Sequence, residues 1–320
     1  MIDFRLTDPN PFTVFVGGNG VGKSNIFEAL EFLNYLISIK NQKIEELFGG
    51  YKNFVNLNGY KKYLKIAIQS EHNYIGFYRE PYESDSPNKV AGVGSTIPIK
   101  ESWDKTHPRI IEYEQIAENF SRIFINNNDI QKIKFFSDSR LASDASNLEN
   151  VLKRIFENTH TREEITEWLQ LFVPEFEKIE IETSLSGKSE LAIFEKNLKQ
   201  PLAKNLISDG TYNILALLTA VFQSDKPQFL CIEEPENGLH PFVIKQLVSF
   251  FRSMCKEKGH YIWLNTHSQT LVAELKPEEI ITVWKENGTT KIRQHKGKNL
   301  YNLDMDEAWL SNALGGGVPW

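Results

Sequence analysis

A glycine-rich run at residues 17–25, GGNGVGKSN, holds the side chains of this chain best suited to binding phosphate. It contains the spacing Gly-x-x-x-x-Gly-Lys-Ser, in which glycines let backbone N–H groups surround a polyphosphate. The lysine of this spacing reaches the β- and γ-phosphates, and the serine hydroxyl ligates Mg²⁺. We therefore expect a nucleoside triphosphate at this loop, with Ser24 as a magnesium ligand. The expected binding residues are Gly17, Asn19, Gly20, Val21, Gly22, Lys23, Ser24 and Asn25.

Two adjacent acids much later in the chain could supply the remaining chemistry. Glu233 and Glu234 end the run FLCIEE, in which four apolar residues are followed by two carboxylates. Such a run predicts a buried strand with the acids at its carboxyl end, where open α/β sheets bind ligands. One acid can hold the water shell of the metal, and the other can orient or deprotonate an attacking water. For an isolated pair, the alternative is a polar strand end followed by a turn.

The segments around both motifs predict the elements that must position them. Apolar residues recur at helical spacing after the glycine-rich loop, and several short runs are apolar throughout. Continuous apolar runs are typical of central strands in a sheet that helices cover on both faces. The expected fold class is α/β, with two halves of one nucleotide-binding domain separated by a long insertion. Helices are expected at 24–40, 208–222 and 241–254, and strands at 11–16, 228–234 and 260–268.

The insertion between the two halves mixes strands, helices and loops. Its first part alternates apolar and polar residues, and a stretch rich in Pro, Ser, Gly and Asn follows. A later helix is expected to begin with a capping box formed by Thr161 and Glu164. We expect a hairpin at 60–80, a surface loop at 81–108, a basic strand at 131–136, helices at 144–158 and 162–172, and strands at 177–183 and 190–195.

Composition excludes several classes of protein. Hydrophobic residues make up 41% of the 320 residues, enough for a core, but no apolar run approaches the roughly 18 residues of a membrane span. The first residues, MIDFRL, lack the features of a secretory signal. A net charge of −6 argues against a globally basic nucleic-acid-binding protein, although a local basic patch stays open. Cys231 and Cys255 form no disulfide framework, so we expect reduced thiols and a cytoplasmic protein.

Four short runs occur together in the order and spacing of ABC-type ATPase heads: GGNGVGKSN, ISDGT, IEEPENGLHP and NTHS. From Phe4 to about Ile292 the chain resembles compact soluble heads of the RecF and SMC kind. It looks closest to the ATPase subunits of OLD-type and Septu-type anti-phage defence systems. The resemblance implies a P-loop ABC-type ATPase head, with a mixed central sheet flanked by helices and an inserted α/β lid subdomain. It also implies ATP as the nucleotide, with Mg²⁺.

The resemblance assigns roles to the acid pair and to a histidine. Glu234 matches the catalytic base, and His267 resembles the switch histidine that senses the γ-phosphate, so both are expected to be catalytic. Glu233 stands where the family usually has Asp, and we expect it to hold the metal. Its longer side chain would have to fold back to reach the same water. The glutamine of the Q-loop has no convincing match at Gln69 or Gln131.

The resemblance also implies how two copies would meet. Such heads dimerise head-to-tail around two ATP molecules, and Ser208 and Gly210 match the signature that contacts the γ-phosphate of the partner. Considered alone, Ser208 could simply cap the helix that follows it. We expect a homodimer through an ATP sandwich, with higher oligomers left open. On this interpretation 1–60 and 206–296 are the two halves of the ATPase core, 61–205 the inserted strands, loop and helical lid, and 297–320 the tail.

These expectations lead to a functional hypothesis and alternatives. We expect a hydrolase that converts ATP and water to ADP and phosphate and acts as an ATP-dependent dimer switch. Its expected setting is prokaryotic anti-phage defence, where it would regulate a separate effector such as a nuclease. The alternative is a RecF/SMC-like DNA-binding ATPase in repair, although no stretch sustains the heptads of a long coiled coil. A slow regulator of the toxin–antitoxin kind is a weaker option, and no membrane partner is expected.

Two surfaces could recruit partners. The segment 285–298 concentrates five basic residues on an apparent hairpin, which fits either a nucleic-acid contact or a solvated face. The final LGGGVPW, with Trp309 shortly before it, fits either docking to a partner or packing onto the rest of the chain.

Overall fold

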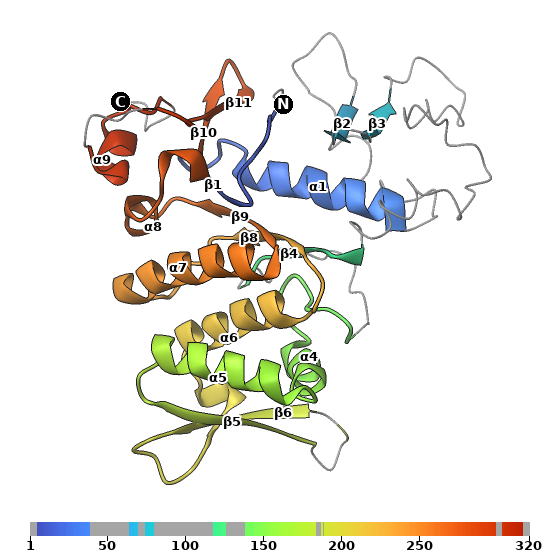
Figure 1. Cartoon of the computed structure of the whole chain (residues 1–320), viewed down its shortest axis with the longest axis vertical. Helices are drawn as coiled ribbons and strands as arrows, with labels where there is room; N and C mark the ends of the chain where they lie inside the picture. Colours follow the sequence, from blue (N-terminus) through green and yellow to red (C-terminus); the bar gives the residue numbers. More distant parts are fainter. Residues whose placement is uncertain are drawn as a thin grey trace, which may run out of the picture.

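The computed structural model describes residues 5–38, 64–69, 74–79, 118–125, 138–183, 187, 189–298 and 303–315. Its centre is a six-stranded sheet with the strand order β11-β10-β1-β9-β8-β4 (Figure 1). Neighbouring strands in it run parallel, except that β11 pairs antiparallel with β10. The mixed sheet expected from the sequence is therefore confirmed. The strands are β1 (Phe12–Val16), β4 (Phe120–Ile123), β8 (Phe229–Glu233), β9 (Tyr261–Thr266), β10 (Ile280–Glu286) and β11 (Thr289–Gln294).

Strand β1 shows why helices must cover both faces of this sheet. Successive side chains of a strand point to opposite faces, and here both sets are buried. Phe15 packs edge-on against Phe27 of α1 (Lys23–Ser38), with 5.6 Å between ring centroids. Val14 lies in the other buried cluster, which contains the apolar face of α7 (Pro241–Lys258). Figure 1 shows α1 and α7 on opposite sides of the sheet.

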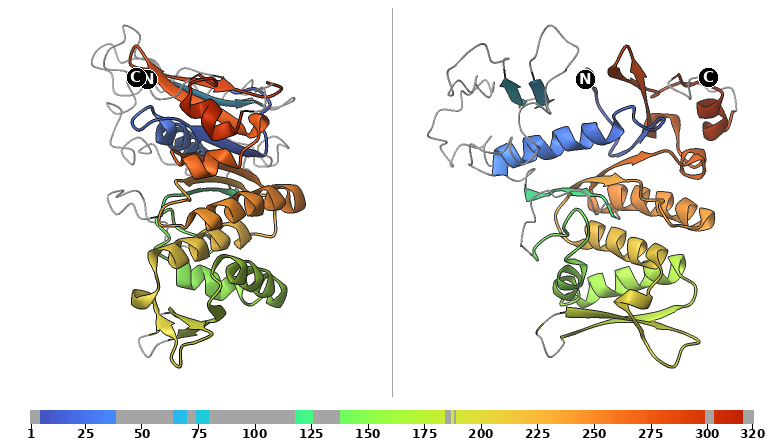
Figure 2. Two further views of the ribbon diagram at one scale, coloured as in Figure 1. Left: turned by 90° about the vertical axis from the view of Figure 1, so that its left-hand side faces the viewer. Right: turned by 180° about the vertical axis from the view of Figure 1, so that it is seen from behind.

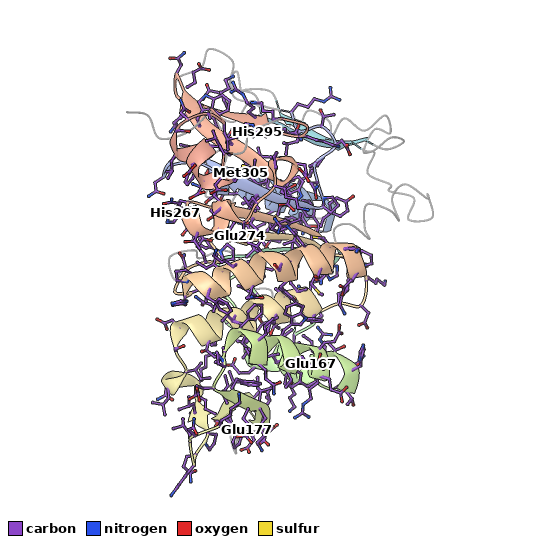
Figure 3. The ribbon with its side chains drawn as sticks, turned by 60° about the vertical axis from the view of Figure 1, so that its left-hand side comes forward. Glu167, Glu177, His267, Glu274, His295 and Met305 are labelled. Carbon is purple, nitrogen blue, oxygen red and sulfur yellow. The ribbon has the colours of Figure 1, made fainter. Side chains whose placement is uncertain are left out.

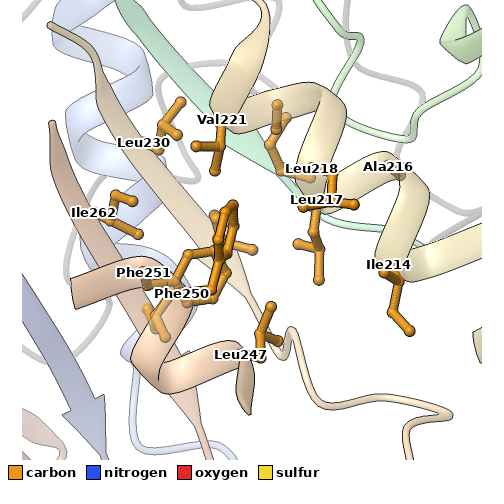
Figure 4. Packing of buried hydrophobic residues seen from close by; sticks show 14 of the residues in the cluster. Ile214, Ala216, Leu217, Leu218, Val221, Leu230, Leu247, Phe250, Phe251 and Ile262 are labelled. Atoms are coloured by element: carbon orange, nitrogen blue, oxygen red, sulfur yellow. The ribbon is translucent and has the colours of Figure 1, made fainter. Parts of the chain in front are cut away.

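A further helix lies beyond α7 and, after its first turn, is buried on all sides. Every residue of α6 (Asp209–Phe222) from Asn213 onward is buried, as expected for a helix that is apolar around its whole circumference. Figure 4 shows side chains of α6 such as Leu218 facing Phe250 of α7. On its other side α6 contacts α4 (Leu148–Ile155) and α5 (Thr159–Phe172).

A small antiparallel sheet closes the far end of the molecule. It consists of β5 (Phe176–Thr183), β6 (Ser189–Glu195) and β7 (Leu202–Ala203), and it packs on α4 and α5. Figure 2 shows it at the opposite end of the long axis from the P-loop helix α1. The remaining elements are β2 (Leu64–Gln69), β3 (Tyr74–Arg79), η2 (Lys204–Leu206), α8 (Gln269–Ala273), η3 (Pro277–Glu279) and α9 (Met305–Leu310).

Most elements expected from the sequence are present, with two local corrections. The hairpin within 60–80 is confirmed by the antiparallel pair β2–β3, and the strands near 177–183 and 190–195 are confirmed as β5 and β6. The capping box of Thr161 and Glu164 is wrong, because α5 begins at Thr159 and Asn158 caps it by accepting the N–H of Thr161 at 3.2 Å. Glu164 instead pairs with Lys258 at 3.0 Å. Helix α4 is also shorter than the expected 144–158.

Other expectations fall partly outside the described residues. The surface loop at 81–108, the basic strand at 131–136 and the residues after Gly315 lie there. Strand β4 was not expected from the sequence. Trp309 is only 5% exposed and lies in the main buried cluster, so this part of the tail packs onto its own chain. The division into domains and the lid role of the insertion stay predictions. Across the described residues, no helix combines the length and the apolar character that a membrane crossing requires.

Candidate nucleotide-binding site

The glycine-rich loop connects β1 to α1, as the sequence predicts, and α1 begins at Lys23. The Lys23 ammonium folds back over the loop and donates to the carbonyls of Gly17 and Gly18, at 2.8 and 2.9 Å. Burial lowers the pKa of Lys23, and the nearby carboxylates of the EEPE run at 233–236 oppose this shift. The lysine is thus a buried cation beside acidic groups, held by carbonyls of the loop.

Strand β11 holds the loop in shape from one side. Thr290 donates its hydroxyl to the carbonyl of Val21 at 2.7 Å. Gly22 has a φ of +102°, and a Cβ atom placed on it would lie 2.4 Å from the Thr290 Oγ1. Any side chain at position 22 would therefore be strained and would overlap the hydroxyl that fixes the loop. The close approach of β11 thus requires glycine at this position of the loop, and a glycine-rich loop at a helix N-terminus fits a polyphosphate.

The acid pair lies at the carboxyl end of β8, as predicted. Glu233 is the last residue of the strand and is 3% exposed. Its Oε1 accepts from Arg122 Nε at 2.6 Å, and its Oε2 accepts from Asn265 Nδ2 at 3.2 Å. Glu234 follows with a left-handed φ of 46°. Its backbone N–H donates to the carbonyl and to the side-chain Oδ1 of Asn265, at 3.0 and 3.1 Å.

Glu234 and His267 meet, although the sequence places them on different strands. His267 Nδ1 lies 3.2 Å from Glu234 Oε1, with 45% and 31% of the two side chains exposed. Asn237 donates to the other carboxylate oxygen at 3.0 Å. Figure 3 shows His267 projecting at the side of the molecule near the end of β9. The two groups expected to be catalytic are therefore in contact and accessible to solvent.

Ser208 stands at the N-terminus of α6. Its Oγ accepts the N–H of Thr211 at 3.1 Å, which confirms the capping interpretation. The residue is exposed, so the cap leaves this end of the helix accessible. Helix N-termini favour anions because of their free N–H groups and dipole. A contact of Ser208 with a partner's phosphate stays a prediction.

Gly210, in the first turn of α6, packs closely against the turn that follows the acid pair. A Cβ on Gly210 would lie 2.7 Å from the carbonyl oxygen of Gly238. One turn further along α6, Asn213 donates to the carbonyl of Asn237 at 2.8 Å. Since Asn237 also binds Glu234, the start of α6 is packed against the same turn that holds the predicted base.

Sequence reasoning missed three buried polar residues of this site: Arg122, Asn265 and Glu236. Glu236 is 8% exposed; its Oε1 accepts from the Thr266 hydroxyl, while its Oε2 is buried without a hydrogen-bond partner among the described residues. Burial raises the pKa of Glu236, and the Thr266 hydrogen bond opposes the shift. Arg122 stands inside the run FSRIFI and Asn265 ends the apolar run YIWL, and a polar residue at these places in a strand is the signal that could have found them.

Of the two residues expected to hold the metal, Ser24 offers a hydroxyl and Glu233 offers a carboxylate that already accepts hydrogen bonds. Ser24 is exposed near the start of α1 and carries a hard oxygen of the kind that Mg²⁺ prefers. Both oxygens of Glu233 accept hydrogen bonds from protein groups. The site thus fits a triphosphate with its magnesium, with Ser24 as the more available protein ligand.

Comparison with known proteins supports the assignment of the fold. A family model described as "AAA domain, putative AbiEii toxin, Type IV TA system" matches residues 12–273. No match is found among curated proteins. The structure is similar to an Smc head bound to the C-winged helix domain of ScpA, with 20% identity, 88% of this chain and 89% of the other covered, and a TM-score of 0.56.

A second solved structure gives the same result. An Smc head domain with an extended coiled coil, bound to the C-terminal domain of ScpA from Pyrococcus furiosus, is 16% identical, with 89% of this chain and 90% of the other covered and a TM-score of 0.55. At these identities the likeness concerns the fold. The predicted ABC-type, SMC-like ATPase head is confirmed at that level.

Proposed function

Because this chain belongs to the family described as "AAA domain, putative AbiEii toxin, Type IV TA system", we propose that it binds and hydrolyses ATP and uses the nucleotide to control its own dimerisation. The P-loop residues, with Lys23, bind the triphosphate. Ser24 ligates Mg²⁺, and Glu233 contributes its negative charge near the metal. Glu234 acts as the base and His267 as the γ-phosphate sensor. The fold and the geometry of the loop support these roles.

One observation carries the catalytic part of the proposal: the contact of His267 Nδ1 with Glu234 Oε1 at 3.2 Å. A carboxylate that takes a proton from water must be accessible and held in place. Glu234 is partly exposed, and Asn237 and His267 hold its two oxygens. In the proposed step Glu234 accepts a proton from the attacking water, whose oxygen bonds to the γ-phosphorus as ADP leaves. Mg²⁺ supplies charge neutralisation to the phosphates when it is bound with ATP.

The surface around the signature supports a dimer. Ser208 and Gly210 lie at an exposed helix N-terminus whose N–H groups could meet the γ-phosphate of a second copy. Leu206, two residues earlier, is 63% exposed, and Phe242 at the start of α7 is 57% exposed. They are the most exposed large apolar side chains of the described residues. A second copy across two ATP molecules would remove this apolar area from water, which favours association.

Two settings for such a switch remain candidates. In the first, the dimer regulates a separate effector, such as a nuclease, in anti-phage defence. In the second, the ATP-bound dimer binds DNA, as in repair ATPases. The β10–β11 hairpin favours the second, because its basic segment lies beside the P-loop. Lys285 of this segment contacts the carbonyl of Gly20 at 3.5 Å, and Arg293 and Lys298 are exposed.

The deciding experiment is the solution mass of the Glu234→Gln protein with and without Mg-ATP, with ATP affinity measured on the same samples. Removing the base should leave binding intact and trap the ATP-bound state, so we expect a monomer that becomes a dimer with ATP. The Lys23→Ala/Glu234→Gln double variant should bind no ATP and stay monomeric. Ser208→Asp, combined with Glu234→Gln, keeps a good helix cap but opposes a phosphate, so it should bind ATP and stay monomeric.

The same samples distinguish the two settings. ATP-dependent affinity for duplex DNA that falls steeply with salt would favour DNA binding. A stable complex with another protein of the host, isolated after nuclease treatment, would favour an effector. A Glu234→Gln protein that binds ATP and keeps the same mass would contradict the dimer switch. An unchanged ATPase rate in Lys23→Ala would contradict the site assignment as a whole.

A further inference from the structure

A buried arginine links the P-loop helix to the strand that carries the acid pair. Arg122 lies on β4, beside β8, and is 8% exposed. Its Nε donates to Glu233 Oε1 at 2.6 Å, and a second guanidinium nitrogen contacts the same oxygen. Its Nη1 donates to Glu31 Oε2, on α1, at 2.8 Å. The Arg122–Glu31 and Arg122–Glu233 contacts therefore join α1 to β8 through one side chain.

The contacts continue from Glu233 to the predicted base. Asn265 Nδ2 donates to the other oxygen of Glu233 at 3.2 Å, and its Oδ1 accepts the backbone N–H of Glu234 at 3.1 Å. Glu234 has a left-handed φ of 46°, a conformation that non-glycine residues keep only where their surroundings determine it. The hydrogen bonds of Asn265 supply that determination. A continuous path of contacts thus runs from α1 to the backbone of Glu234.

The two carboxylates that contact Arg122 carry more negative charge than is needed to neutralise its guanidinium. Burial alone would lower the pKa of the Arg122 guanidinium, but the carboxylates of Glu233 and Glu31 outweigh it and raise the pKa. One carboxylate would neutralise the charge, so the second contact adds a connection rather than neutrality. Glu31 lies eight residues after Lys23 on the same helix, about 12 Å along its axis at 1.5 Å per residue. The guanidinium fork can hold both acids at fixed angles, which a lysine ammonium does not do.

We propose that Arg122 is the positioning residue of the acid pair: its fork fixes Glu233 against the P-loop helix and, through Asn265, fixes the backbone of Glu234. In this role Glu233 is an anion whose charge Arg122 already offsets, and it is not the principal ligand of the magnesium. The inference rests on the proposed function, because it concerns the groups assigned to hydrolysis. It predicts that the shape of the side chain at position 122 governs turnover, while the P-loop alone governs nucleotide affinity.

The test compares Arg122→Lys with Arg140→Lys. Arg140 is a matched control, because it also is partly buried beside β4 but donates to the carbonyl of Phe120 and to Asn119 rather than to the acid pair. For Arg122→Lys we expect kcat to fall about 100-fold, as a displacement near 1 Å does. Its dissociation constant for ATP, measured with Mg²⁺, should stay within about threefold. Arg140→Lys should leave both quantities within the same limit.

A second variant covers the case in which Arg122→Lys fails to fold. Glu31→Gln keeps the Arg122–Glu233 contact and weakens the connection to α1, so kcat should fall about tenfold with ATP affinity unchanged. The melting temperature of each protein is also measured without nucleotide, so that a loss of stability can be separated from a loss of turnover. A purely structural role predicts a lower melting temperature with kcat per folded molecule unchanged, and this result would overturn the inference.

The outcomes separate this inference from the proposed function. A wild-type protein without turnover contradicts both. A wild-type protein that hydrolyses ATP, with an Arg122→Lys variant that matches it, contradicts the inference alone. Parallel losses of ATP affinity and kcat in Arg122→Lys also contradict it, because the P-loop would then depend on Arg122.

Discussion

The nucleotide edge of the six-stranded sheet and the region around the small sheet differ in how completely they bury charge. At the edge, Lys23, Arg122, Glu233 and Glu236 are between 3% and 8% exposed. In the region around the small sheet, the ion pairs Lys178–Glu180 and Lys204–Glu149 each include an exposed lysine, and the core below them is apolar.

This difference shows which part of the chain is destabilised by buried charge. Removing charges from water is expensive even when they are paired, and a buried carboxyl oxygen without a partner, as in Glu236, adds to the cost. In the two pairs near the small sheet the first cost is smaller, because the lysine of each pair stays in water, although Glu149 itself is 8% exposed. The nucleotide edge therefore differs in that both signs of charge are buried together around the candidate site.

The largest expected effect is on ATP affinity, and it distinguishes Gly22 from Gly187, two glycines with a positive φ. Gly22→Ala should weaken ATP binding about 100-fold, because strain of about 1–2 kcal/mol and overpacking against Thr290 of about 1–3 kcal/mol must distort the loop. Gly187→Ala, near the small sheet, has a φ of +80° but no atom within 4 Å of the new Cβ, and it should leave ATP affinity unchanged.

Titration calorimetry with ATP measures both variants. The added change Thr290→Ala should recover part of the affinity of Gly22→Ala, since it removes the hydroxyl that the Cβ meets at 2.4 Å. An ATP affinity of Gly22→Ala within about threefold of the wild type would contradict the role of the close contact with β11.

A core substitution at the far end should affect stability without affecting binding. Leu169 is fully buried in α5, so Leu169→Ala should lower the free energy of unfolding by about 3 kcal/mol through lost contacts and a cavity. Leu171, 45% exposed on the same helix, is the control, and Leu171→Ala should change stability by less than about 0.5 kcal/mol. Denaturant unfolding gives both values. An ATP affinity more than tenfold weaker in Leu169→Ala would contradict the independence of the two regions.

Acid should destabilise the nucleotide edge through His295. This residue is buried behind β11 beside Thr282, and burial, with Lys298 and Arg293 nearby, lowers its pKa to about 4. The unfolded chain takes up a proton near pH 6.5 and the folded chain does not. Stability is therefore complete above pH 6.5 and is lost as the pH falls towards 4, by about 3 kcal/mol.

Unfolding by urea at pH 7 and pH 4.5 measures the loss. Since His295→Gln removes the titrating group, the difference in stability between the two pH values should shrink in that variant. A variant with the same pH dependence as the wild type would assign the effect to other groups.

The smallest expected effect comes from Glu236. Because burial raises the pKa of this carboxyl, the folded state holds a proton that the unfolded state has already released, and stability falls as the pH rises above the ordinary value of 4.5. Glu236→Gln should therefore raise the melting temperature at pH 7, with a smaller gain at pH 4. Glu180→Gln, on the exposed face of the small sheet, should leave the melting temperature unchanged at both pH values. A lower melting temperature for Glu236→Gln at pH 7 would mean that its charge is needed, for example by Lys23.

The sequence by itself determined the features that depend on neighbouring residues. The Gly-x-x-x-x-Gly-Lys-Ser spacing places Lys23 at the start of a helix after a buried strand, because glycine conformations and helix termini are local properties. Apolar runs likewise predicted β1, β8 and β9, and Ser208 was recognised as a potential helix cap. Local rules failed where two signals competed, as at α5, where Asn158 rather than Thr161 caps the helix.

Only the tertiary structure decided which polar groups meet. Arg122 and Glu233 lie 111 residues apart in the chain, and Arg122 and Glu31 lie 91 apart. Nothing in the local pattern specifies that β4 lies beside β8 or that Asn265 lies between two acids. Strand order and register set those contacts, and burial then made them consequential, since a charge removed from water must find a partner. The residues that can do chemistry were legible in the sequence, and the residues that hold them in place emerged from the packing of the sheet.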